Sequence, residues 1–299
     1  LHKGIFMSPF PSLLEQFRAF YKQNNPKDLE TAIEYFAVFG GLDIAVDTTR
    51  PIKRLIEELI LEEYKHHNNM IMEHTKADKL AHALLTGIAS GDGRIHSAIK
   101  RARITDVEGK MATFVLKNSE LINFSYSLET PNIENRNGAD VSDRGEFVTP
   151  FLRFWFAFVS PLFKGVQARE YREVEERYSN KKQEFSDYIY EKLTLELLQV
   201  NASKEDPIIS VGSYWDNVLS IELLAKTKSG KLIAGTCKTS KSKSKTSELN
   251  KLKELCEQAG LDPEVLVLFS KSGFTKELKE LKGEKLRLLT IKNFKKLLE

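Results

Sequence analysis

Apolar side chains recur at helical spacing between residues 10 and 75, in three successive groups. Each group predicts the buried face of one helix. The residues of these groups are Leu13, Leu14, Phe17, Phe20 and Tyr21, then Ile33, Phe36 and Phe39, then Leu55, Ile56, Leu59 and Ile60. Asn25-Pro26 predicts a cap and a first-turn proline for the second helix, and Pro51 precedes the third. The pattern therefore predicts a helical N-terminal region over residues 1–78.

Shorter apolar groups separated by tight connections follow in residues 79–146. The segments LAHALLTGIASG, GRIHSAIKRARI and ITDVEGKMATFVLKNSELI predict three short helices. The next segment, FSYSLETPNIENRNGADVSD at residues 124–143, predicts a two-stranded ribbon.

Residues 147–163, FVTPFLRFWFAFVSPLF, contain seven aromatic side chains and a single charge, Arg153. So many aromatics suggest base stacking, a membrane-surface helix or a buried helix. We favour the buried helix because the larger apolar residues share faces at helical spacing. These residues are Phe151, Trp155, Phe156, Val159 and Phe163.

The last third of the chain changes to strand patterns. The segments VGSYWDNVLSIELLA (211–225), KLIAGTCKTS (231–240) and VLVLFSKSGF (265–274) are rich in β-branched and apolar residues. They predict a C-terminal α/β domain. Residues two apart on a strand face the same way, so Thr236 and Lys238 are expected to project together beside Glu222.

Composition limits the class of protein. A chain of 299 residues with 41% hydrophobic and 29% charged residues predicts two or three folded units of a soluble protein. No apolar run approaches the roughly 20 residues of a membrane span, and LHKGIFMSPF lacks the features of a signal peptide. We therefore expect a cytoplasmic protein without a membrane partner. Cys237 and Cys256 do not form a disulfide framework.

Positive charge is concentrated although the net charge is only +3. Between residues 226 and 253 there are nine lysines and one acidic residue, Glu248. The stretch KTSKSKSKTS, which carries Lys241, Lys243 and Lys245, predicts a mobile loop that meets phosphates without reading bases. The alternative is a solvated loop without a partner.

The order of an acidic strand, a GTCK strand and an apolar strand resembles the C-terminal domain of the archaeal-type DEXX-box P-loop ATPases. That domain belongs to the restriction-endonuclease-like PD-(D/E)XK superfamily. The segment FLRFW is close to the linker motif of this family, with Thr149 where the family has Asp, and EYFAVFGGLDIAVDTTRPIKRLIEELILEEYK resembles its lid region. The three short helices and ribbon are similar to its winged helix-turn-helix. No GxxxxGK[ST] phosphate loop occurs, so ATPase activity is not expected from these residues.

The resemblance implies an α/β multidomain fold. A helical lid-like region (1–78) precedes a winged helix-turn-helix (79–146). An aromatic linker helix and charged connector (147–182) then lead to a restriction-endonuclease-like domain with a mixed central sheet (183–299).

The resemblance to this family also implies a site for Mg²⁺-dependent phosphodiester cleavage. Glu191, Glu222 and Lys238 match catalytic positions, with Glu222 as the metal ligand, while Thr236 stands where the family has Glu. A hydroxyl is a far weaker Mg²⁺ ligand than a carboxylate, so the site is expected to be degenerate. No cofactor is certain, and Mg²⁺ is expected only if cleavage survives. The alternative for Glu222 and Lys238 is a structural ion pair.

DNA is the expected partner. The predicted contacts are Lys241, Lys243 and Lys245, with Arg101, Arg103 and Lys110 in the winged helix. The expected function is DNA binding by a nuclease-like fold with a degenerate site. Two alternatives stay open: a Mg²⁺-dependent DNA nuclease, and an interaction module that docks on an ATPase or another protein through the N-terminal helices.

Overall fold

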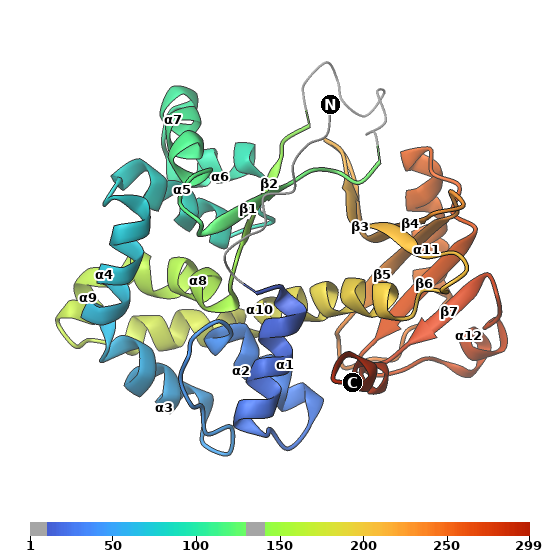
Figure 1. Ribbon diagram of the computed structural model, residues 1–299, viewed down its shortest axis with the longest axis horizontal. Coiled ribbons are helices and arrows are strands. Elements are labelled where there is room, and N and C mark those ends of the chain that lie inside the picture. Colours follow the sequence, from blue (N-terminus) through green and yellow to red (C-terminus); the bar gives the residue numbers. More distant parts are fainter. Residues whose placement is uncertain (1–10, 130–140) are drawn as a thin grey trace. The chain divides into compact units, whose positions relative to one another are not determined.

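The computed structural model describes residues 11–129 and 141–299, in two compact units (Figure 1). The first unit contains the chain up to Ser125 together with Ser142–Phe185. The second contains Ser186–Glu299 together with residues 126–129 and 141. The predicted α/β multidomain fold is confirmed, because a helical N-terminal region precedes a mixed five-stranded sheet.

The first unit begins with α1 (Leu13–Asn24) and α2 (Leu29–Phe39), whose predicted apolar faces are largely buried. The prediction that Asn25-Pro26 starts the second helix is wrong. Asn25 ends α1 in the left-handed conformation (φ 43°), which asparagine tolerates better than most residues. Asp28 starts α2 instead, because its side chain accepts a hydrogen bond from the Thr31 backbone N–H at 2.7 Å.

The third predicted helix follows Pro51 as expected, but a π-helical turn interrupts it. It consists of α3 (Ile52–Ile56), a π-helical turn (Glu57–Leu61) and α4 (Tyr64–Thr75). The π-turn inserts extra backbone into the helix, which the apolar periodicity does not reveal.

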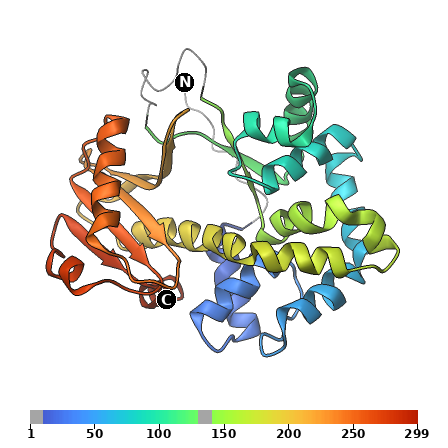
Figure 2. The same cartoon turned by 180° about the vertical axis from the view of Figure 1, so that it is seen from behind.

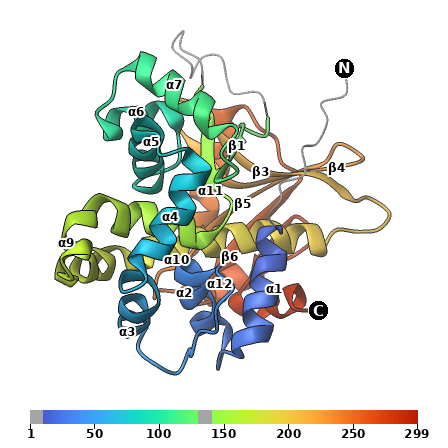
Figure 3. The same cartoon turned by 60° about the vertical axis from the view of Figure 1, so that its left-hand side comes forward.

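The three predicted short helices are α5 (Lys79–Ala89), α6 (Ile95–Ala102) and α7 (Asp106–Leu116), grouped together in Figure 3. An antiparallel ribbon follows, made of β1 (Ile122–Ser125) and β2 (Arg144–Phe147). Its strands therefore lie mostly outside the predicted ribbon at 124–143, of which residues 130–140 fall outside the described chain. A Cβ atom on Gly145 of β2 would lie 3.0–3.4 Å from side-chain atoms of Ile88, Ile95 and Ile122, so this strand position is closely packed.

The aromatic segment is buried, as predicted. It contains α8 (Pro150–Phe154), a second π-turn (Trp155–Val159), a 3₁₀ turn (Ser160–Leu162) and α9 (Phe163–Gln167). Trp155 is only 1% exposed and stacks on Tyr64, with ring centroids 5.4 Å apart. Phe163 is the exception to the predicted buried face, because it is 42% exposed.

A long helix, α10 (Arg172–Val200), leads into the second unit. The sheet there has the order β3-β4-β5-β6-β7, in which β3, β4 and β5 are antiparallel and β5, β6 and β7 are parallel. The strands are β3 (Ile208–Trp215), β4 (Ser220–Thr227), β5 (Leu232–Lys238), β6 (Val265–Ser270) and β7 (Leu286–Leu289). The predicted strand at 211–225 is thus a hairpin. Asp216 makes its turn by accepting backbone hydrogen bonds from Val218 and Leu219, each 2.8 Å long.

Helices cover both faces of this sheet. On one face α11 (Thr246–Ala259), orange in Figure 2, packs against Leu224, Ala234 and Leu268. On the other, Leu195 and Leu198 of α10 belong to a separate cluster. The small helix α12 (Lys276–Glu280) and a 3₁₀ helix (Ile291–Leu297) complete the unit. Side chains alternate along a strand, so Leu232 and Ala234 of β5 face α11 while Ile233 between them belongs to the opposite cluster.

Candidate functional site

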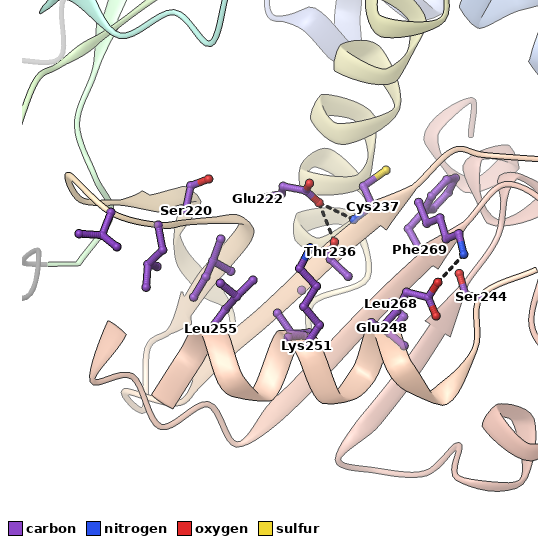
Figure 4. Close-up of a pocket in the computed structure, with 16 residues that line it drawn as sticks. Ser220, Glu222, Thr236, Cys237, Ser244, Glu248, Lys251, Leu255, Leu268 and Phe269 are labelled. Carbon is purple, nitrogen blue, oxygen red and sulfur yellow. Dashed lines mark hydrogen bonds and ion pairs between the residues drawn. The ribbon is translucent and has the colours of Figure 1, made fainter. Parts of the chain in front are cut away.

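Glu222 of β4 and Thr236 of β5 lie side by side on the sheet, on strands whose register pairs Leu223 with Gly235. The Thr236 hydroxyl donates a hydrogen bond to Glu222 Oε2 at 2.8 Å, and the Cys237 backbone N–H donates to the same oxygen at 2.7 Å (Figure 4). One carboxylate oxygen of Glu222 therefore already accepts two hydrogen bonds.

Lys238 takes a different partner. Its ammonium forms an ion pair with Glu248 of α11 and contacts the Lys243 carbonyl oxygen at 3.4 Å. Burial raises the pKa of Glu248, but hydrogen bonds from Lys238 and from the Lys245 backbone N–H outweigh burial and lower that pKa to about 2. The ion pair of Lys238 thus crosses from the sheet to α11.

Gly235 lets β5 come close to its neighbour at this point. A Cβ atom on Gly235 would lie 2.6 Å from the Val267 carbonyl oxygen of β6. Glycine therefore allows the close approach that holds Thr236 and Lys238 in place.

Glu191 comes from α10, which packs on the face of the sheet opposite α11. Its charge acts on the Cys237 thiol, which lies 4.0 Å from the Thr194 hydroxyl of the same helix. Burial raises the pKa of Cys237 well above its ordinary value, and the charges of Glu222, Glu191 and Asp187 raise it further. Sequence analysis missed Asp187, although it lies four residues before Glu191 and hence on the same helical face.

A metal site here would use the acidic side chains near β4 and β5. Within residues 11–129 and 141–299, no group of three or more His, Cys, Asp or Glu side chains is arranged to hold a metal ion. Thr236 donates a hydrogen bond to Glu222, and its neutral hydroxyl does not supply a second anionic ligand.

A cavity of about 550 Å³ opens between β4, β5 and α11. Its polar lining includes Glu222, Thr236 and the Lys238–Glu248 pair, and its apolar lining includes Leu252 and Leu255. Figure 4 shows that Lys251 extends from α11 toward Thr236.

Sequence analysis did not single out Glu248 or Lys251 as site residues. The sequence did contain a signal, because two residues spaced three apart on a helix lie on the same face. The ammonium of Lys251 gives the cavity a positive group beside the polar strand residues.

The lysine segment, residues 239–245, borders this cavity, because Ser244 lines it. Lys241, Lys243 and Lys245 are exposed, as predicted. The segment is a loop, as predicted, and its backbone is tied at Ser244 to the segment after β6. The Ser244 N–H donates to the Gly273 carbonyl oxygen at 2.9 Å, and the Thr275 N–H donates to the Ser244 carbonyl oxygen at 3.0 Å.

The other predicted DNA contacts belong to the first unit. Arg101 donates to the Gly87 carbonyl oxygen at 3.4 Å and to Asp92 at 3.3 Å, so it also has a structural role. Arg103 ends α6 in the left-handed conformation (φ 55°) and is exposed, and Lys110 is exposed on α7.

Residues 155–250 match the model of one protein family, DUF234, described as archaea bacterial proteins of unknown function. The matched range extends from the aromatic segment into α11 and includes Glu191, Glu222, Thr236 and Lys238. No curated protein and no solved structure matches the chain. None of the helices formed by the described residues is long and apolar enough to cross a membrane.

Proposed function

We propose that the second unit binds DNA through its nuclease-like fold and does not cleave it. The observation that carries the proposal is the lysine segment, in which Lys241, Lys243 and Lys245 are exposed and Ser244 lines the cavity. Exposed lysines at a phosphate backbone give affinity through charge and counterion release, without a requirement for base sequence.

The geometry around Glu222 argues against cleavage. Oxygen Oε2 of Glu222 is engaged by Thr236 and Cys237, and the charge of Lys238 is balanced by Glu248. Phosphodiester cleavage of the type implied by the resemblance needs anionic metal ligands and an available cation beside the scissile phosphate. The arrangement therefore favours binding over hydrolysis.

Duplex DNA binding tests the proposal. Replacing Lys241, Lys243 and Lys245 together with Ser should weaken binding to all sequences alike. Because each neutralised phosphate contributes about 0.9 to the slope of log affinity against log salt, the slope should flatten by up to about three. Fluorescence anisotropy at several salt concentrations measures both quantities.

The matched control replaces three exposed lysines elsewhere in the unit, Lys276, Lys279 and Lys282, with Ser. Both triple variants remove the same charge, so only a site-specific effect distinguishes them. Equal losses in the two variants would mean that the lysine segment has no special role, and unchanged binding in both would remove the support for DNA binding.

A Mg²⁺-dependent nuclease is the second candidate. The observation that favours it is the combined electrostatic effect of Glu191, Asp187 and Glu222 on the Cys237 thiol, since these acids come from both α10 and β4. Incubation of supercoiled plasmid with the protein and Mg²⁺ or Mn²⁺ separates the two functions. Nicks that disappear in Glu222→Ala and Lys238→Ala would establish cleavage, and an intact plasmid with retained DNA binding supports the proposed function.

A further inference from the structure

The outward face of α7 is apolar. Val107, Met111 and Phe114 are 69%, 58% and 72% exposed. Their spacing of i, i+4 and i+7 places them in one stripe along the helix. We call these three residues the α7 stripe.

The helix cannot rotate to bury this stripe, because its opposite face is already packed. Gly109, Ala112 and Leu116 are buried on that side. A Cβ atom on Gly109 would lie 2.4 Å from Ile99 Cδ1, so α7 is in close contact with α6. A capping box between Thr105 and Glu108 fixes its first turn. The α7 stripe is therefore a stable surface of the first unit.

Positively charged side chains lie beside the α7 stripe. Lys110 and Lys117 are exposed along one flank, and exposed Arg103 lies in the short connection between α6 and α7. Glu108 lies on the other side and is engaged by the backbone N–H and hydroxyl of Thr105. Asp106, at the start of the helix, is outnumbered by the three cations.

This chemistry differs from that of a helix that reads DNA. Base edges are read mainly by polar side chains, and phosphates need cations, whereas the centre of this face presents three apolar groups. Apolar residues at i, i+4 and i+7 are instead the anchors by which a helix docks on an apolar protein surface. Burial of such exposed groups drives association, and rim charges set the choice of partner.

We propose that α7 is a protein-docking helix whose partner is an acidic amphipathic helix. The apolar face of the partner covers Val107, Met111 and Phe114, and its Asp and Glu side chains meet Lys110 and Lys117. This interface belongs to the first unit, whereas the proposed DNA-binding surface belongs to the second.

The test uses the full chain and two synthetic helical peptides with the same leucine face. One peptide has flanking glutamates, and the other has lysines at those positions. The glutamate peptide should bind at least about tenfold more tightly, measured by fluorescence anisotropy. Met111→Gln with Phe114→Ser should weaken its binding at least about tenfold. Ile209→Thr, which changes an equally exposed apolar residue of β3, is the matched control and should leave binding unchanged.

Charge reversal makes the test specific. Lys110→Glu with Lys117→Glu should reverse the preference, so that the lysine peptide binds more tightly. Equal binding of both peptides, or equal losses in the α7 and Ile209 variants, would overturn the proposal. A dimer of the wild-type chain that dissociates on Phe114→Ser would assign the stripe to a second copy. Loss of duplex DNA binding in that variant, without loss of peptide binding, would assign it to DNA.

Discussion

Replacing Glu248 with Gln should make the stability of the protein less dependent on pH. The wild-type carboxylate is held by Lys238 and by the Lys245 backbone N–H, which lower its pKa from 4.5 to about 2. A group with a lowered pKa stabilises the folded state above its unfolded pKa, and this stabilisation is lost as pH falls through the folded pKa. The contribution of Glu248 is therefore complete near pH 7 and disappears between about pH 5 and pH 2.

The pKa sets the magnitude. One pKa unit corresponds to about 1.4 kcal/mol, so the lowering from 4.5 to about 2 gives an upper value of about 3.4 kcal/mol. Solvent screens part of this, because the Glu248 side chain is 26% exposed, and we expect about 1–3 kcal/mol. Glu248→Gln should lower the free energy of unfolding by this amount at pH 7. The difference between the two proteins should be much smaller at pH 2.5 than at pH 7, because most of the stabilisation is lost as pH approaches the folded pKa of about 2.

Urea unfolding followed by circular dichroism at pH 7, 5, 3.5 and 2.5 measures this difference. Glu254→Gln, an identical change at an exposed position of α11, is the control and should alter stability by less than about 0.5 kcal/mol. If the difference between wild type and Glu248→Gln stays constant from pH 7 to pH 2.5, the ion pair with Lys238 is not the source of the stabilisation and the reasoning is refuted.

Two further substitutions test the packing. Trp155→Ala should cost about 3–5 kcal/mol, since the ring is 1% exposed and stacks on Tyr64; a melting temperature equal to that of wild type would refute the buried assignment. Gly235→Ala should cost about 1–3 kcal/mol by forcing β5 and β6 apart, because its Cβ would lie 2.6 Å from a backbone oxygen. Gly212→Ala on β3, where a Cβ would have no neighbour within 4 Å, is its control, and equal melting temperatures in the two glycine variants would contradict this account.

The parts of the fold that follow from local pattern could be predicted from the sequence. The helical spacing around Trp155 predicted a buried segment. Alternation predicted that Thr236 and Lys238 project together beside Glu222, and the Thr236 hydroxyl does donate a hydrogen bond to Glu222. Long-range choices could not be predicted. Lys238 has a flexible side chain that can reach either Glu222 or Glu248, and only the position of α11 decides between them.

The β1–β2 ribbon and the β3–β4 hairpin also depend on contacts that the local sequence pattern does not reveal. Glycine weakens a strand locally, yet Gly145 belongs to β2, where it pairs with Phe124 of β1, a partner distant in sequence. Asp216 ends β3 within an otherwise continuous strand pattern, because its carboxylate bonds two backbone N–H groups beyond it.

The backbone ties of the lysine segment have a thermodynamic consequence. Ordering the backbone of a flexible residue costs about 1–2 kcal/mol in conformational entropy. In a disordered lysine loop, this cost would be subtracted from the binding free energy for each residue that a ligand orders. The hydrogen bonds of Ser244 to Gly273 and Thr275 order the backbone at that residue during folding instead. A polyanion that contacts the segment therefore has less backbone left to order, and association there needs fewer contacts to reach a given affinity.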